Sequence, residues 1–166
     1  SMLRLQQMAT KDVLTSLGNR AGFEQSMIRQ LGWAQRHNDP FALLVIDLDN
    51  FKYVNDNYGH REGDKVLVHV ASHLVNVLRD EDEPFRYGGD EFCCLLDCQT
   101  QQQLACAAQR IQHSVNSSGY LRGLGVSCSL GGAIFREGDT TGSLFDRADS
   151  ALYRVKSSGK NSYHAA

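Results

Sequence analysis

The stretch Pro84-Phe85-Arg86-Tyr87-Gly88-Gly89-Asp90-Glu91-Phe92 decides the fold, because it sets two glycines and two acids between two segments that can be extended. Paired glycines accept the positive φ angles that two-residue hairpin turns require, so the stretch predicts a tight β-hairpin. Adjacent strand residues point to opposite faces, so one of Asp90 and Glu91 can face a metal while the other faces a substrate. Taken alone, the stretch is equally compatible with a solvated turn.

The composition is that of one globular domain of 166 residues, 42% hydrophobic and 22% charged. Seventeen basic residues against nineteen acidic ones give a formal net charge of -2, so no general positive field attracts nucleic acid or anionic membrane. We therefore expect no nucleic-acid partner and no membrane contact by this domain. Any phosphate binding must be local.

Five cysteines, an odd number without C-x-x-C spacing, indicate buried thiols in a reducing compartment. No apolar run approaches the ~20 residues that span a bilayer. We expect a cytoplasmic domain over 13–166, with 1–12 as a polar lead-in from an upstream region. A membrane-attached full-length protein is compatible with this arrangement.

Hydrophobic periodicity predicts strands that alternate with helices. An unbroken apolar run at 41–46 indicates a strand buried on both faces. Helices are expected at 19–37, 50–58, 67–78, 104–115 and 144–155, and strands at 41–46, 85–87, 92–96, 126–135 and 161–163. This order predicts an α/β (α+β) fold with a central mixed, mostly antiparallel sheet flanked by helices and an active-site hairpin, rather than a doubly wound sheet.

Asp47 follows the buried strand directly. If the hairpin pairs beside that strand, Asp47 and Asp90 meet at one edge of the sheet and repel each other unless a cation lies between them. Carboxylate oxygens suit Mg²⁺, with Mn²⁺ as the alternative ion, held together with substrate phosphates. The other interpretation is that Asp47 and Asp49 cap the next helix, and we prefer it for Asp49.

The residues that follow Asp49 in the chain offer polar groups that can bind a nucleotide. The backbone amides of Asn50, Phe51 and Lys52 begin a short helix, a geometry that suits phosphate oxygens. Asn55 and Asp64 can bond a purine edge, and a carboxylate that accepts from N1–H and the 2-amino group selects guanine. By themselves, both are also ordinary surface residues.

Lys156 and Lys160 lie four residues apart at the end of the last predicted helix, on one face. They can clamp terminal phosphates. Their commoner use is to complement the helix dipole at its C-terminus, and that alternative stays open.

Together these motifs resemble the GGDEF-domain diguanylate cyclase family. The resemblance spans nearly the whole chain and rests on an ordered set of motifs: Asp12-Val13-Leu14-Thr15, Asp47-Leu48-Asp49-Asn50-Phe51-Lys52, Asn55-Asp56, Gly63-Asp64, Gly88-Gly89-Asp90-Glu91-Phe92, Ala148-Asp149-Ser150-Ala151-Leu152-Tyr153 and Gly159-Lys160-Asn161. Such a set is far more specific than the five-residue signature alone.

The resemblance implies a nucleotidyl cyclase or polymerase palm fold that condenses two GTP into cyclic di-GMP and two pyrophosphates. It implies that a homodimer is needed, since each domain binds one GTP. The implied metal ligands are Asp47, the Leu48 carbonyl, Asp90 and Glu91, with Glu91 also a candidate for activating the 3′-hydroxyl. The implied nucleotide contacts are Asn50, Phe51, Lys52, Asn55, Asp64, Gly88, Gly89, Lys156 and Lys160.

Arg79 and Asp82 form an Arg-x-x-Asp motif that resembles the family's inhibitory site for cyclic di-GMP, and the alternative is an ordinary charged loop between a helix and a strand. Two rival functions remain. One is a non-catalytic module that binds GTP or cyclic di-GMP, and the other is a cyclase that acts on a single nucleotide. The retained Asp47, Asp90 and Glu91 argue against the first rival, and the guanine-reading pair argues against the second.

Overall fold

The computed structural model describes the backbone of residues 1–166 and the side chains of residues 1–5 and 9–166. Its strands are β1 (Ala42–Asp49), β2 (Glu83–Arg86), β3 (Glu91–Leu96), β4 (Ser127–Ile134) and β5 (Tyr163–Ala165). Its helices are α1 (Met2–Thr10), α2 (Arg20–His37), α3 (Phe51–Tyr58), α4 (His60–Val77), α5 (Gln101–Asn116), α6 (Gly119–Gly123) and α7 (Thr141–Ser157). None of these helices, in the part of the chain that is described, has both the length and the apolar character to cross a bilayer.

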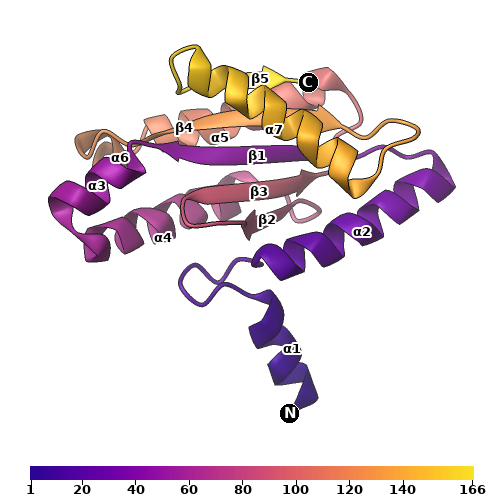
Figure 1. The fold of residues 1–166 in the computed structure, drawn as a ribbon, viewed down its shortest axis with the longest axis horizontal. Coiled ribbons are helices and arrows are strands. Elements are labelled where there is room, and N and C mark those ends of the chain that lie inside the picture. The colour runs from indigo at the N-terminus through magenta and orange to yellow at the C-terminus, as the bar shows by residue number, and fades with distance from the viewer.

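The strands form one sheet in the order β2-β3-β1-β4-β5. β1 lies at the centre and pairs antiparallel with β3 on one side and β4 on the other, while only β5 runs parallel to its neighbour β4. Figure 1 shows this sheet with helices on both faces. The predicted mixed, mostly antiparallel sheet is confirmed.

Alternation along the central strand divides the core into two layers. Leu44 and Ile46 face α4 and α5, whereas Leu43 and Val45 face α2 and α7. All four side chains are at most 4% exposed. Because the strand is buried on both faces, its sequence is an unbroken apolar run. The same alternation puts Asp47, two residues beyond Val45, on the α7 face at the end of the strand.

Several boundaries differ from those predicted. The lead-in forms α1, and the Ser1 side chain caps this helix by accepting a hydrogen bond from the Arg4 amide. α1 packs against α2. α4 begins at His60, directly after the positive-φ Gly59 that ends α3, seven residues earlier than the hydrophobic pattern indicates. α6 was not predicted at all, since five residues are too few to show a period.

The hairpin between β2 and β3 exists, but its turn is not the predicted tight one. Four residues, 87–90, separate the strands, and neither Gly88 nor Gly89 has a positive φ. The prediction of a two-residue turn was therefore wrong. A Cβ added to Gly89 would meet no atom within 4 Å, so the fold itself does not demand a glycine there.

Candidate active site

The acids predicted to meet do meet at one edge of the sheet. Asp47, near the end of β1, lies opposite Glu91, the first residue of β3. The Leu48 amide donates to the Asp90 carbonyl over 3.2 Å, which holds the acidic turn beside the end of β1. Backbone pairing therefore brings three carboxylates from distant parts of the chain to one place.

Lys156 reaches this edge from α7. Its Nζ lies 3.1 Å from Asp47 Oδ2 and 2.7 Å from Asp49 Oδ1. This contact shows that Lys156 is not confined to complementing the helix dipole, and its contact with terminal phosphates stays a prediction. The lysine supplies a positive charge next to the carboxylates.

Asp49 does not cap α3, so that interpretation was wrong. Asn50 is the N-cap, and its side chain makes no cap bond. The carboxylate of Asp49 is 1% exposed and accepts bonds from the Ser127 and Ser129 hydroxyls, each over 2.7 Å, from Lys156 Nζ, and from the Asn161 amide over 3.1 Å. Burial raises its pKa, but these donors outweigh burial and hold the pKa below 3.8.

The negative charge of Asp47 is less well compensated than that of Asp49. Burial and the nearby charge of Asp90 raise its pKa to about 6, although Lys156 acts in the opposite direction. Burial and Asp90 likewise raise the pKa of Glu91. Asp47 Oδ1 is buried and has no hydrogen-bond partner among the described residues.

These features fit a hard divalent cation. An unpartnered carboxylate oxygen beside two further acids is a donor set that Mg²⁺ or Mn²⁺ accepts. Within the described residues, no three His, Cys, Asp or Glu side chains are already gathered as a metal cage. The acids would therefore hold a cation together with backbone and ligand oxygens, as is usual for Mg²⁺.

Arg86 braces the glycine turn. Its guanidinium donates to the carbonyls of Gly88 and Gly89 over 3.0–3.3 Å and to the Asp12 carboxylate over 3.2 Å. The Arg86 amide also donates to the Gly18 carbonyl. One side chain thus ties the turn to the chain that follows α1.

The pair proposed to read guanine lies where α3 turns into α4. A Cβ at Gly63 would collide with the Asn55 side chain, so glycine is what allows α4 to pass so close. Asp64 follows next in the chain and is exposed. The turn between the two helices therefore brings the Asn55 side chain against Gly63, the residue that precedes Asp64.

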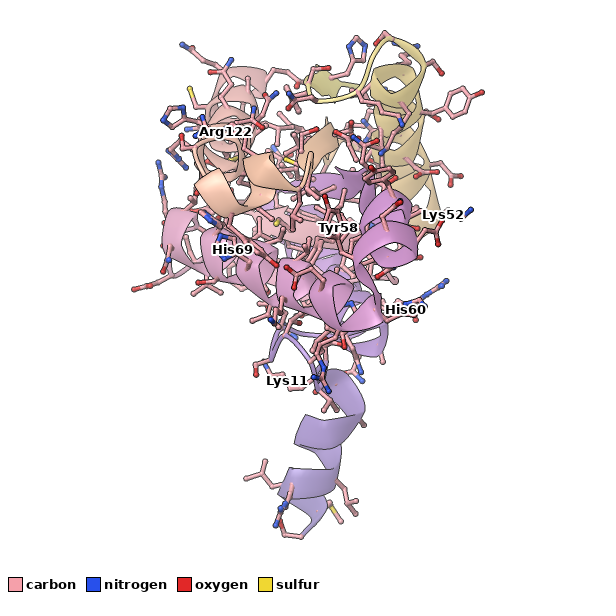
Figure 2. The ribbon with its side chains drawn as sticks, turned by 90° about the vertical axis from the view of Figure 1, so that its left-hand side faces the viewer. Lys11, Lys52, Tyr58, His60, His69 and Arg122 are labelled. Carbon is pink, nitrogen blue, oxygen red and sulfur yellow. The ribbon has the colours of Figure 1, made fainter. Side chains whose placement is uncertain are left out.

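The other predicted phosphate contacts, which are the backbone amides at the start of α3 and the side chains of Lys52 and Lys160, stay predictions. Lys52 extends outward from α3 (Figure 2), is 91% exposed and pairs with Asp56 over 3.8 Å. Phe51 is half-buried against the core, and Asn50 donates from its side chain to the Gly125 carbonyl. Lys160 is exposed, in the loop whose Asn161 amide is bonded to Asp49.

Arg79 and Asp82 lie at a separate cavity of about 440 Å³. Asp82 holds the loop itself, since its carboxylate accepts from the Arg79 and Asp97 amides. A second arginine, Arg110 from α5, lines the same cavity. Two guanidinium groups thus border one polar hollow.

Sequence reasoning missed the roles of three residues. Asp49 was assigned to capping, although its place two residues after Asp47 in a strand puts both acids on one face. Arg86 stands inside the signature stretch but has no periodic or charge pattern of its own. Arg110 lies 28 residues beyond Asp82, and nothing in the sequence links the two.

The fold and this edge define a class of protein: a mixed-sheet α/β domain with an acidic strand end suited to a divalent cation and a phosphorylated ligand. Comparison with known proteins gives the family. The family profile "Diguanylate cyclase, GGDEF domain" matches residues 9–162, and the chain belongs to this family.

Two curated relatives and one solved structure illustrate the likeness. The chain is 40% identical to diguanylate cyclase DgcS of Shewanella oneidensis over 92% of its length and 51% of the relative's. It is 34% identical to diguanylate cyclase DgcP of Pseudomonas aeruginosa over 96% of its length and 24% of the relative's. The chain thus spans about half of the first relative's length and about a quarter of the second's.

The crystal structure of the coiled coil and GGDEF domain of DgcB from Caulobacter crescentus, in complex with c-di-GMP, superposes with a TM-score of 0.94 at 33% identity. The match covers 99% of this chain and 90% of that one. The predicted family and fold are both confirmed.

Proposed function

We propose that this domain is a diguanylate cyclase, which condenses two GTP into cyclic di-GMP and releases two pyrophosphates. The observation that carries the proposal is the convergence of Asp47, Asp90, Glu91 and Lys156 at the end of β1, with a buried carboxylate oxygen left unpartnered. Family membership and the relatives named as diguanylate cyclases support it.

Asp47, Asp90, Glu91 and the Leu48 carbonyl are the proposed ligands of Mg²⁺ or Mn²⁺. When bound, the ion supplies charge stabilisation for the attacking and leaving oxygens of an in-line phosphoryl transfer. The protein's own part is to position the substrate and neutralise its charge. Glu91, whose pKa is raised, is suited to take the proton of the attacking 3′-hydroxyl.

Lys156 is the proposed partner of the triphosphate. Held by Asp49, its ammonium can exchange Asp47 for a phosphate oxygen without leaving the edge. The amides at the start of α3, Lys52 and Lys160 are the further phosphate contacts proposed from the family pattern. Asn55 and Asp64 read guanine, and the bare backbone at Gly88 and Gly89 leaves room for the nucleotide.

In each half-reaction the 3′-oxygen of one GTP bonds to the α-phosphorus of the other, and pyrophosphate leaves. Two such steps close the ring. Because one domain presents one acidic edge, two domains face each other about a two-fold axis to align both nucleotides. A homodimer is therefore the proposed active form.

The cavity at Arg79, Asp82 and Arg110 is the proposed inhibitory site for cyclic di-GMP. Two arginine forks suit the phosphates and guanine edges of that product. The cavity lies between the loop that precedes β2, which carries Arg79 and Asp82, and α5, apart from the acidic edge. Product bound there would restrain turnover without competing for the GTP site.

The proposal is tested with the concentrated domain, Mg²⁺ and GTP, with nucleotide products identified by mass. Asp90→Asn is the control, expected to abolish turnover by weakening the metal site. Cyclic di-GMP from the unmutated chain alone supports the cyclase. GTP binding without product, even after fusion to a dimerising coiled coil, would instead identify a non-catalytic binding module.

Product feedback has its own test. Arg79→Ala and Arg110→Ala are expected to leave the initial rate unchanged and to relieve inhibition by added cyclic di-GMP. Asp80→Asn, which changes a charge in the same loop, is the control for a general electrostatic effect. If inhibition persists in both arginine variants, the cavity is not the inhibitory site.

A further inference from the structure

Two histidines on α4 make a contact that the proposed cyclase function does not use. His69 and His73 lie four residues apart, so their side chains project from the same face of the helix. Their Nε2 atoms are 3.1 Å apart. Both rings are half-buried and reach solvent, on a side of the molecule formed by α4, α5 and α6, where Figure 2 shows His69 next to α6.

Serine hydroxyls orient both rings. His73 Nδ1 lies 2.6 Å from Ser114 Oγ of α5, and His69 Nε2 lies 3.0 Å from Ser118 Oγ, the N-cap of α6. The ring of Tyr120 packs 4.9 Å from that of His69 and covers one side of the pair. A hydrogen bond at Nδ1 fixes the His73 ring with its Nε2 toward His69, which is how proteins orient metal-binding histidines.

The separation of the two rings fits a shared ion. Two imidazoles that meet at one ion about 2.05 Å from each Nε2, with these atoms 3.1 Å apart, subtend roughly 98° at the ion. Because Nε2 lies about 1.15 Å from its ring centre, the centres of such a pair are about 4.8 Å apart. A head-on N–H···N bond of the same length would place them about 5.4 Å apart. The observed distance is 4.8 Å.

We propose that His69 and His73 chelate one divalent transition-metal ion of the Zn²⁺, Ni²⁺ or Cu²⁺ class. Imidazole nitrogens suit these ions, whereas the Mg²⁺ of the proposed catalytic site requires oxygen ligands. No third His, Cys, Asp or Glu side chain completes the site within the described residues. Water and the Ser118 hydroxyl therefore fill the remaining positions, and the ion is exchangeable rather than permanently enclosed.

Binding has a structural consequence. The chelate closes one turn of α4, the helix whose first half carries Asp64. An ion that binds the folded helix and not the unfolded chain stabilises the fold by mass action. The thermal midpoint therefore rises with the concentration of Zn²⁺ or Ni²⁺. This inference concerns other residues than the cyclase proposal and does not depend on it.

The test is calorimetric titration of the domain with NiCl₂ and ZnCl₂ in buffer that contains excess Mg²⁺. One ion is expected per chain. Relative to the unmutated chain, the affinity for the metal ion should fall at least tenfold in His69→Gln and at least tenfold in His73→Gln. His60→Gln, on the same helix but exposed (Figure 2), should bind as the unmutated chain does.

A second measurement needs no variant. In long-range ¹H–¹⁵N spectra of the histidine rings, Zn²⁺ should shift the Nε2 signals of two rings and leave the other four histidines unchanged. Binding that is absent, that survives both His69→Gln and His73→Gln, or that shifts other rings would overturn the proposal.

Discussion

At the scale of single residues, Asp49 contributes most to the order of the candidate site. Its buried carboxylate joins β4 through two serines, α7 through Lys156 and the following loop through the Asn161 amide. A buried charge is tolerated only when it is paired and fully bonded, and Asp49 satisfies both conditions. The residue holds in place a lysine that the chemistry is proposed to use.

We expect Asp49→Asn to lower the free energy of unfolding by about 1–3 kcal/mol, because an amide cannot accept from all of the buried donors that the carboxylate satisfies. Urea unfolding followed by circular dichroism measures this change. Asp56→Asn, which removes the partner of the exposed Lys52, should produce no measurable change. Equal stability of the two variants would show that the buried network is not stabilising.

A second residue-scale prediction concerns acid. Asp139 is 4% exposed and pairs with Arg147 of α7. Burial raises its pKa, but the Arg136 amide, the Ser143 hydroxyl and the charge of Arg147 outweigh burial and hold the pKa below 3.8. The carboxylate therefore contributes stability that is complete above pH 3.8 and is lost as the pH falls through its lower folded-state pKa.

Thermal melts between pH 7 and pH 2 measure this dependence. The midpoint should fall steeply below pH 3.8 in the unmutated chain. Asp139→Asn should melt lower at pH 7 and show a flatter acid limb, because the variant has no proton to take up at that position. A limb of unchanged slope would assign the acid sensitivity to other carboxylates, such as Asp12 and Asp49.

At the scale of elements, α7 determines where Lys156 lies. Its backbone approaches β4 so closely that a Cβ at Gly131 would overlap the main chain at Ala148 and Leu152. Main-chain atoms of a packed helix and strand cannot move aside independently. Glycine in the middle of this strand therefore sets the spacing between α7 and the sheet.

We expect Gly131→Ala to destabilise the fold by about 1–3 kcal/mol through overpacking and to reduce turnover by displacing Lys156. Chemical unfolding and a cyclic di-GMP assay measure the two effects. Gly119→Ala in α6, where an added Cβ meets nothing within 4 Å, should be neutral or slightly stabilising and fully active. A harmless Gly131→Ala would contradict the close-approach argument.

Most elements could be predicted because their patterns are long. The apolar run of β1 and the helical spacing of α2, α5 and α7 stand out against the rest of the chain. The hairpin turn was misjudged because glycine permits positive φ without requiring it. β5 was placed two residues early, since a three-residue edge strand has no period to locate it.

The site was predictable to a different degree. The meeting of Asp47 and Asp90 could be predicted only on the condition that the hairpin pairs beside the buried strand, and the pairing of β3 with β1 meets that condition. The network of Asp49 with Lys156, and the brace that Arg86 forms with Asp12, depend on tertiary packing between segments about 70–110 residues apart. No local pattern encodes such contacts.

At the scale of the whole molecule, one domain presents one acidic edge, and the proposed reaction consumes two nucleotides. Turnover per domain should therefore rise with protein concentration until dimers predominate. Initial rates from nanomolar to high micromolar protein measure this dependence. Fusion to a dimerising coiled coil should abolish it, whereas a constant specific activity across the range would contradict the dimer requirement.

The two outer strands have a consequence for how such domains can associate. β2 has four residues and includes Pro84, which has no amide hydrogen to donate, and β5 has only three residues. Short, proline-containing edges offer little backbone for a foreign strand to extend, which also protects against amyloid-like stacking. Two copies would therefore join through side chains and loops rather than by merging their sheets into one.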